Sequence, residues 1–118
     1  ELSALYDVAH GAGLAVIFPA WMTFVMKHNI NRFAQVAVRV WGCQMNYDKP
    51  EETAKEGIKR LKQFLTSIGM PISFSELGAK EEGIPVMIEK LNLGKNGTIG
   101  NFVQLNSQDV EQIYRLAL

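Results

Sequence analysis

The stretch "RFAQVAVRVWG", residues 32–42, decides the fold class of this sequence. Its apolar residues recur at the spacing i, i+3, i+4, i+7 and i+8, at Phe33, Val36, Ala37, Val40 and Trp41. That period is typical of an amphipathic α-helix with one face turned toward a core. Gly42 follows the apolar face directly, as glycine commonly does where a helix ends. The segment therefore predicts a helix.

A second helix is predicted downstream by its end signals. Asp48 followed by Glu51 has the spacing of a capping box, and Pro50 is tolerated in a first helical turn. Gly69 and Pro71 mark the end. The predicted inward face consists of Ala54, Ile58, Leu61, Leu65 and Ile68. The charged residues between them are interpreted as a solvated face.

Upstream, residues 12–26 are apolar apart from Thr23. A bilayer span needs about 20 such residues, and this shorter run also contains Pro19. It is interpreted as a buried core helix and not as a membrane span.

The C-terminal half continues the helical pattern. A short element at residues 73–77 closes at Gly78, a helix runs from Pro85 to about Leu93, and the glycine-rich residues 94–101 form a loop. Asn106 or Ser107 caps a last helix. The inward positions are Ile84, Ile88 and Leu91 in the first of these helices and Val110, Ile113, Tyr114 and Ala117 in the second. The prediction is one all-α domain, residues 1–118, a bundle of five or six helices.

Composition excludes several classes of function. Twelve basic residues balance twelve acidic ones, so neither nucleic acid nor an anionic membrane surface is an expected partner. Cys43 is the only cysteine, which excludes an intrachain disulfide and favours a reducing, cytoplasmic setting.

From chemistry alone, His10 has two readings. A histidine beside glycines is most often a residue at a helix end, whereas a metal site needs three or four convergent donors. Asp7 lies at i−3 from His10, a spacing that places both side chains on one helical face, so it could be a metal ligand, a carboxylate that orients the imidazole, or an exposed residue near a helix end. His28 is interpreted as a surface or helix-end residue. "GAGLAV" at residues 11–16 lacks the strand and the acidic residue of a phosphate-binding motif.

Several blocks together resemble one family. They are "ELSALYDVAHGAGLAVIFPAW", "RFAQVAVRVWG", "GIKRLKQFLTSIGMPISFSELG", "IPVMIEKL" and "GNFVQLNSQDVEQIYRLA". The chain resembles the iron-dependent (group III) alcohol dehydrogenases, in particular the NADPH-dependent butanol dehydrogenases, over nearly its whole length.

The resemblance implies the C-terminal helical domain of a two-domain enzyme whose N-terminal α/β domain, absent from this chain, holds NAD(P). A divalent metal, Fe²⁺ or else Zn²⁺, would lie between the domains, held by one aspartate and three histidines. His10 matches the last of these histidines, and Asp7 matches no ligand. The loop "GTIGNFV" resembles a segment near the substrate, which makes Phe102 a candidate contact for a primary alcohol or aldehyde such as butanol or butyraldehyde. The isolated chain is expected to be inactive.

A different class remains open beside the dehydrogenase. The chain could be a non-catalytic helical domain that binds a partner, or associates into a homo-oligomer, through an exposed apolar surface.

Overall fold

The computed structural model describes all residues from Glu1 to Leu118 and contains seven α-helices and two short 3₁₀ helices. The only β pairing is an isolated antiparallel bridge between Ile99 and Leu105. The all-α prediction is therefore confirmed, with one helix more than the upper expectation. In chain order the elements are α1 (Leu2–Tyr6), α2 (His10–Val25), η1 (Met26–His28), α3 (Ile30–Arg39), α4 (Pro50–Ser67), α5 (Phe74–Leu77), η2 (Glu81–Gly83), α6 (Ile84–Leu91) and α7 (Ser107–Leu116).

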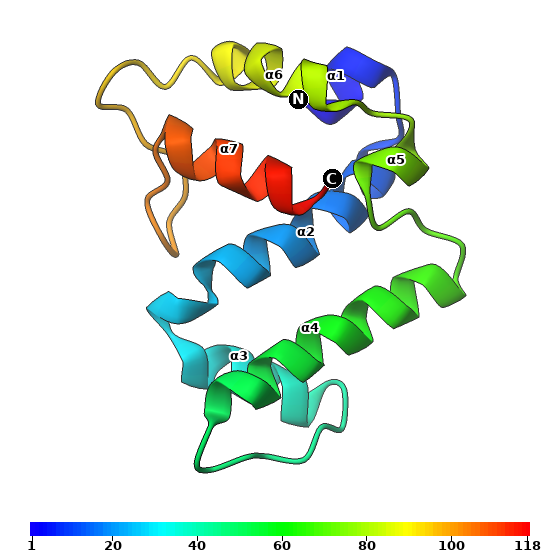
Figure 1. Ribbon diagram of the computed structural model, residues 1–118, viewed down its shortest axis with the longest axis vertical. Helices are drawn as coiled ribbons and strands as arrows, with labels where there is room; N and C mark the ends of the chain where they lie inside the picture. Colours follow the sequence, from blue (N-terminus) through cyan, green and yellow to red (C-terminus); the bar gives the residue numbers. More distant parts are fainter.

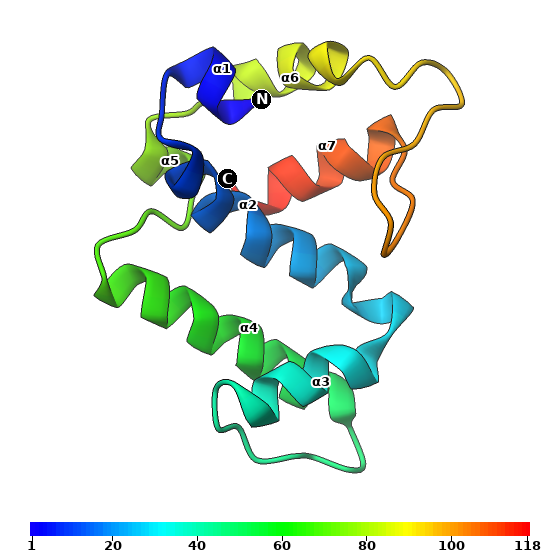
Figure 2. The ribbon, with the colours of Figure 1, turned by 180° about the vertical axis from the view of Figure 1, so that it is seen from behind.

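Helix α2 runs through the middle of the molecule (Figure 1). Helices α3 and α4 pack together on one side of it, and α1, α5, α6 and α7 lie on the other side. The reverse view in Figure 2 shows the same division, with the long α6–α7 connection at one edge. The molecule measures 41 × 35 × 18 Å, so it is thin in one direction.

The central helix α2 is buried over much of its length because it contacts both halves of the molecule. Val16 is 1% exposed and Val25 is 2% exposed. Pro19 lies inside the helix, and its carbonyl accepts a hydrogen bond of 2.8 Å from the Thr23 hydroxyl. The expectation of a core helix at residues 12–26 is confirmed. No helix of the chain combines the length and the apolar character that a bilayer crossing requires.

Helices α3 and α4 approach each other closely at Gly57. A Cβ atom built there would lie 2.9 Å from the Cα atom of Ala37, and Ala37 is fully buried. A larger residue at position 57 would push the helices apart. Glycine at this point in the sequence therefore sets the spacing of the α3–α4 pair.

The start of α4 differs from the prediction. Its N-cap is Lys49, whose side chain makes no capping hydrogen bond, so the Asp48–Glu51 capping box is wrong. Because a residue that precedes proline avoids the helical region, the helix begins at Pro50 itself. The polar side chains bond elsewhere: the Asn46 side-chain oxygen accepts from the Lys49 amide at 2.9 Å, and the Thr53 hydroxyl accepts from the Asn46 amide at 2.8 Å.

Two predicted core residues are exposed. Val40 is 63% exposed and Ile68 is 57% exposed. Helix α3 ends at Arg39 and α4 ends at Ser67, so each residue lies just beyond the last helical turn and leaves the inward face. The helical period continued in the sequence past the point where the helix stopped. Gly42 and Gly69, predicted as helix ends, both have positive φ, at 68° and 79°.

The C-terminal half agrees closely with the prediction. Ser73 caps α5, and Gly78 follows it with φ 81°. Asn106 and Asp109 form a complete capping box at the start of α7. The four residues predicted to face inward from α7 are all buried: Val110, Ile113, Tyr114 and Ala117. In α6, Met87 is fully buried and is a core residue that the predicted face omitted.

Candidate functional site

His10 is the first residue of α2 and is exposed to solvent. The helix start leaves backbone amides without partners, and the macrodipole places partial positive charge there. His10 borders a hollow of about 180 Å³ between α1, α2 and α7. The hollow is lined by Glu1, Leu2, Ser3, His10, Gly13, Leu14, Ile17 and Tyr114. His10 is thus an exposed helix-end residue at the rim of this hollow.

Asp7 does not share a helical face with His10. It ends α1 in the left-handed conformation, with φ 53° and ψ 41°, and its amide donates to the Ser3 carbonyl. Residues 7–9 therefore form a turn between two helices, and the i−3 spacing does not bring the two side chains together as it would in a continuous helix. The shared-face argument for Asp7 is wrong because the helix breaks there.

The chain by itself does not provide a complete set of metal ligands. No group of three or more His, Cys, Asp or Glu side chains is arranged to hold a metal ion. His28, the other histidine, lies at the end of η1, beyond the far end of α2. A metal at His10 would need further ligands from outside residues 1–118 to reach the usual three or four.

Phe102 lies in an aromatic cluster at the other end of α2. Its ring centroid is 5.8 Å from that of Trp21, 5.8 Å from that of Phe33 and 5.3 Å from that of His28. Trp21 is eleven positions from His10, which is about 16 Å along a helix axis. The two residues predicted for one site, His10 and Phe102, are therefore not brought together.

An apolar groove lies between α2 and α4, on the helix face that begins at His10. It has a volume of about 480 Å³ and is lined by Gly11, Leu14, Ala15, Phe18, Leu61, Leu65, Ile68 and Met70. Leu14 is 52% exposed and Phe18 is 49% exposed, and they follow His10 at i+4 and i+8. Sequence reasoning missed the groove because these residues read as part of an apolar core helix.

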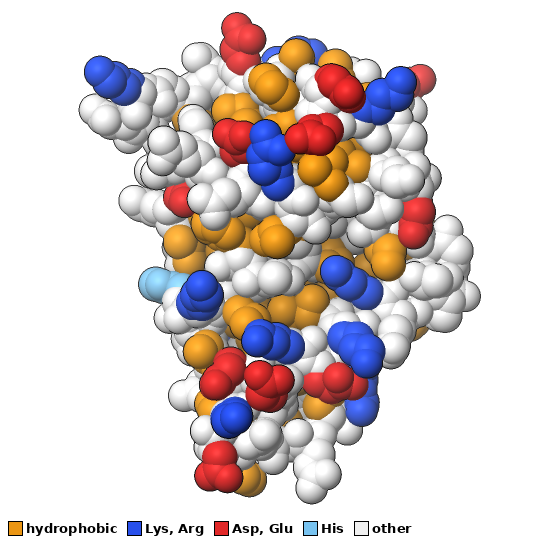
Figure 3. Space-filling view, viewed as in Figure 1, with side chains coloured by type: hydrophobic (Ala, Val, Ile, Leu, Met, Phe, Trp, Pro, Cys, Tyr) orange, Lys and Arg blue, Asp and Glu red, His pale blue; other side chains and the backbone are white.

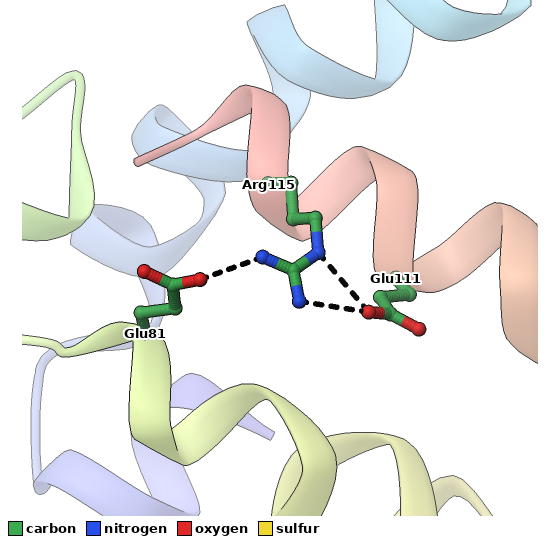
Figure 4. A network of polar contacts seen from close by, with 3 residues as sticks. All are labelled: Glu81, Glu111 and Arg115. Carbon is green, nitrogen blue, oxygen red and sulfur yellow. Dashed lines mark hydrogen bonds and ion pairs between the residues drawn. The ribbon is translucent and has the colours of Figure 1, made fainter.

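Charge near the site comes from few groups. Burial raises the pKa of the Tyr114 hydroxyl, and the nearby Glu1 carboxylate acts in the same direction. Arg115 bridges two carboxylates, at 2.7 Å from Glu81 and 2.9 Å from Glu111, as Figure 4 shows. The hydrogen bond to Glu81, and to a smaller extent that to Glu111, raises the pKa of this guanidinium. The Arg115–Glu81 pair also connects α7 to η2. Elsewhere both signs of charge are interspersed with apolar side chains (Figure 3).

Comparison with solved structures indicates the class of protein to which this fold belongs. The chain superposes on the solved structure of NADH-dependent butanol dehydrogenase A from Thermotoga maritima with a TM-score of 0.88 and 36% identity, over 98% of this chain and 30% of that one. A crystal structure of 1,3-propanediol oxidoreductase matches with a TM-score of 0.82 and 28% identity, over 99% of this chain and 30% of that one. The fold is therefore the all-helical domain of these dehydrogenases.

The family follows from the sequence. The model of the "Fe-containing alcohol dehydrogenase family, C-terminal" matches residues 1–118. NADH-dependent butanol dehydrogenase A of Clostridium acetobutylicum is 34% identical over 98% of this chain, and probable NADH-dependent butanol dehydrogenase 1 of Bacillus subtilis is 38% identical over 99% of it. This chain belongs to the Fe-containing alcohol dehydrogenase family. It spans about 30% of the length of these relatives, whose names specify NADH where the sequence resemblance suggested NADPH.

Proposed function

We propose that this chain is the C-terminal part of an NAD(P)-dependent, metal-dependent alcohol dehydrogenase, and that His10 is one of the metal ligands. The observation that carries the proposal is the match of residues 1–118 to the family at 34–38% identity to butanol dehydrogenases. The exposed position of His10 at the start of α2 supports its proposed role as a metal ligand. The metal is Fe²⁺, with Zn²⁺ as the alternative, and the substrates are a primary alcohol and its aldehyde, such as butanol and butyraldehyde.

When bound, the metal supplies Lewis-acid polarisation of the substrate oxygen, and NAD(P) exchanges the hydride. The residues of this chain would contribute a metal ligand held in a fixed position and the electrostatic field of a helix end. His10 offers a neutral imidazole nitrogen from a helix terminus that the rest of the core holds in place. The positive end of the α2 dipole favours negative charge that develops on an oxygen nearby. The other ligands and the nicotinamide site belong to the segment outside residues 1–118.

Phe102 is proposed only for a contact remote from the metal. Its neighbours Trp21 and Phe33 make that end of α2 apolar and aromatic. Phe102 packs on Trp21, which lies about 16 Å along α2 from His10, so its contact would be with a part of the substrate turned away from the metal.

The first test compares the isolated chain with the full-length enzyme. We expect the 118-residue chain to give no turnover above background with butanol or butyraldehyde and either nicotinamide cofactor, because it lacks a complete ligand set. The full-length enzyme should turn over the same substrates. The measurement is the absorbance change of the reduced cofactor. Turnover by the isolated chain, or none by the metal-loaded enzyme, would contradict the proposal.

The apolar groove between α2 and α4 favours a second candidate function, a helical domain that associates with another chain. Its lining includes the half-exposed side chains Leu14 and Phe18. We expect the isolated chain to form a homo-oligomer, because association would cover the half-exposed Leu14 and Phe18 side chains of this groove. Size-exclusion chromatography with light scattering measures the mass. A monomer at every concentration tested would argue against association through this groove.

A further inference from the structure

The Tyr6 hydroxyl joins the end of α1 to the connection between α5 and α6. It donates a hydrogen bond of 3.1 Å to the Lys80 carbonyl and accepts one of 3.2 Å from the Lys80 amide. A tyrosine hydroxyl has one proton to donate and can also accept, so a single side chain satisfies both backbone groups of a residue 74 positions away. Figures 1 and 2 both show α1 beside the chain that leads into α6.

Gly83 provides the space for this contact. A Cβ atom at Gly83 would fall on the Tyr6 hydroxyl, 2.9 Å from the Tyr6 Cζ atom and 3.1 Å from the Leu5 Cδ2 atom. The backbone of Gly83 has φ −78°, which any residue adopts. Glycine is therefore needed here for the close approach of Tyr6 and not for its own conformation.

The anchored helix α1 forms a wall of the hollow at His10. Leu2 and Ser3 line that hollow, and the Leu2 Cβ atom lies 3.6 Å from the position of a Cβ on Gly13. Leu2, which is 5% exposed, and the hydrogen bond of the Tyr6 hydroxyl to Lys80 hold α1 against the neighbouring elements.

The path from the anchor to His10 is short and tightly turned. Asp7 follows Tyr6 in the left-handed conformation, and only Val8 and Ala9 then precede the first residue of α2. A non-glycine residue with positive φ persists where its surroundings hold it. Tyr6 lies immediately before this turn. A movement of its ring would therefore shift residues 7–9 and, with them, the start of α2.

We propose that Tyr6, seated on Gly83 and Lys80, is a positioning residue for the metal ligand His10. The inference rests on the proposed role of His10 and adds a residue that acts through it. The hydroxyl–backbone contact fixes where the chain enters α2 and so sets the direction of the His10 imidazole relative to α1. It acts on metal affinity through geometry, as contacts that orient a ligand do.

The test uses the full-length enzyme and measures metal affinity by competition with a chelator, beside thermal stability and turnover. Tyr6→Phe and Gly83→Ala should each weaken metal binding, by less than the loss of about 10- to 100-fold that follows removal of a group hydrogen-bonded directly to a ligand. Tyr47→Phe is the matched control, since Tyr47 is 87% exposed and loses only a hydroxyl. Asn106→Ala, which removes the α7 cap, should lower the melting temperature and leave metal affinity unchanged.

The double variant Tyr6→Phe with Gly83→Ala sharpens the test. Removal of the Tyr6 hydroxyl takes away the atom that the added methyl group meets first, and leaves the ring Cζ atom at 2.9 Å. The metal-affinity loss of the double variant should therefore be smaller than the two single losses combined, which is a non-additive result. Fully additive losses would overturn the assignment of the clash to Tyr6.

Two further outcomes separate this inference from the proposed function. Wild-type metal affinity in Tyr6→Phe, combined with loss of metal in His10→Ala, would overturn the positioning role alone. Unchanged metal affinity in His10→Ala would overturn the proposed function and this inference with it. A loss in Asn106→Ala equal to that in Tyr6→Phe would show a general effect of stability and would also overturn the positioning role.

Discussion

Replacement of His10 with alanine in the full-length enzyme is expected to lower metal affinity and turnover together, each by at least about 100-fold. Loss of a direct ligand should cost no less than the upper end of the effect seen for groups that only orient one. The structure offers no substitute, because no cluster of donor side chains within residues 1–118 could take over the metal. Metal content by elemental analysis and the initial rate with butyraldehyde are the two measurements.

His28→Ala is the matched control for His10→Ala. His28 lies at the end of η1, where its ring packs edge-on against Phe102 with a centroid distance of 5.3 Å. Its loss should leave metal content unchanged and turnover within about a factor of two. The positions of the two histidines at opposite ends of α2 make the comparison specific. Equal, mild effects of both substitutions would refute the ligand assignment of His10.

The fold was predictable wherever the helical period coincided with an end signal. At α7 the Asn106 cap and the inward residues lay within one short segment, and both are as predicted. At α4 the signals conflicted, because Asp48 and Glu51 had capping spacing while Pro50 restricted its predecessor Lys49. The backbone restriction prevailed over the side-chain hydrogen bonds. Short α1 was missed because five residues carry less than two turns of pattern.

The candidate site was predictable only in part, since most of its relations are tertiary. The helix-end position of His10 was one of two interpretations that its sequence neighbours allowed, and its exposure is known only from the fold. The separation of Phe102 from His10 did not, because the course of the loop after α6 is set by packing on Trp21 and Phe33. Nothing in the sequence joins Tyr6 to Gly83, which lie on segments that meet only in the folded chain.

The prediction with the largest effect on stability concerns Phe74. Phe74→Ala is expected to lower the free energy of unfolding of the 118-residue chain by about 3–5 kcal/mol, the usual cost of removing a buried aromatic ring. Phe74 is 1% exposed, its ring centroid lies 6.1 Å from that of Tyr114, and its amide donates to the Ala117 carbonyl at 2.8 Å. Urea unfolding followed by circular dichroism gives the measurement.

Phe64→Ala makes the same chemical change at a position that is 47% exposed, and it should cost about 1 kcal/mol. Similar losses in the two variants would contradict the assignment of Phe74 to the core. The expected difference has a structural reason beyond burial. Helix α5 has four residues and cannot persist alone, so the Phe74 side chain and amide connect it to α7. Because α5 also packs on α2, loss of the Phe74 side chain should loosen the contacts of α5 with both α7 and α2.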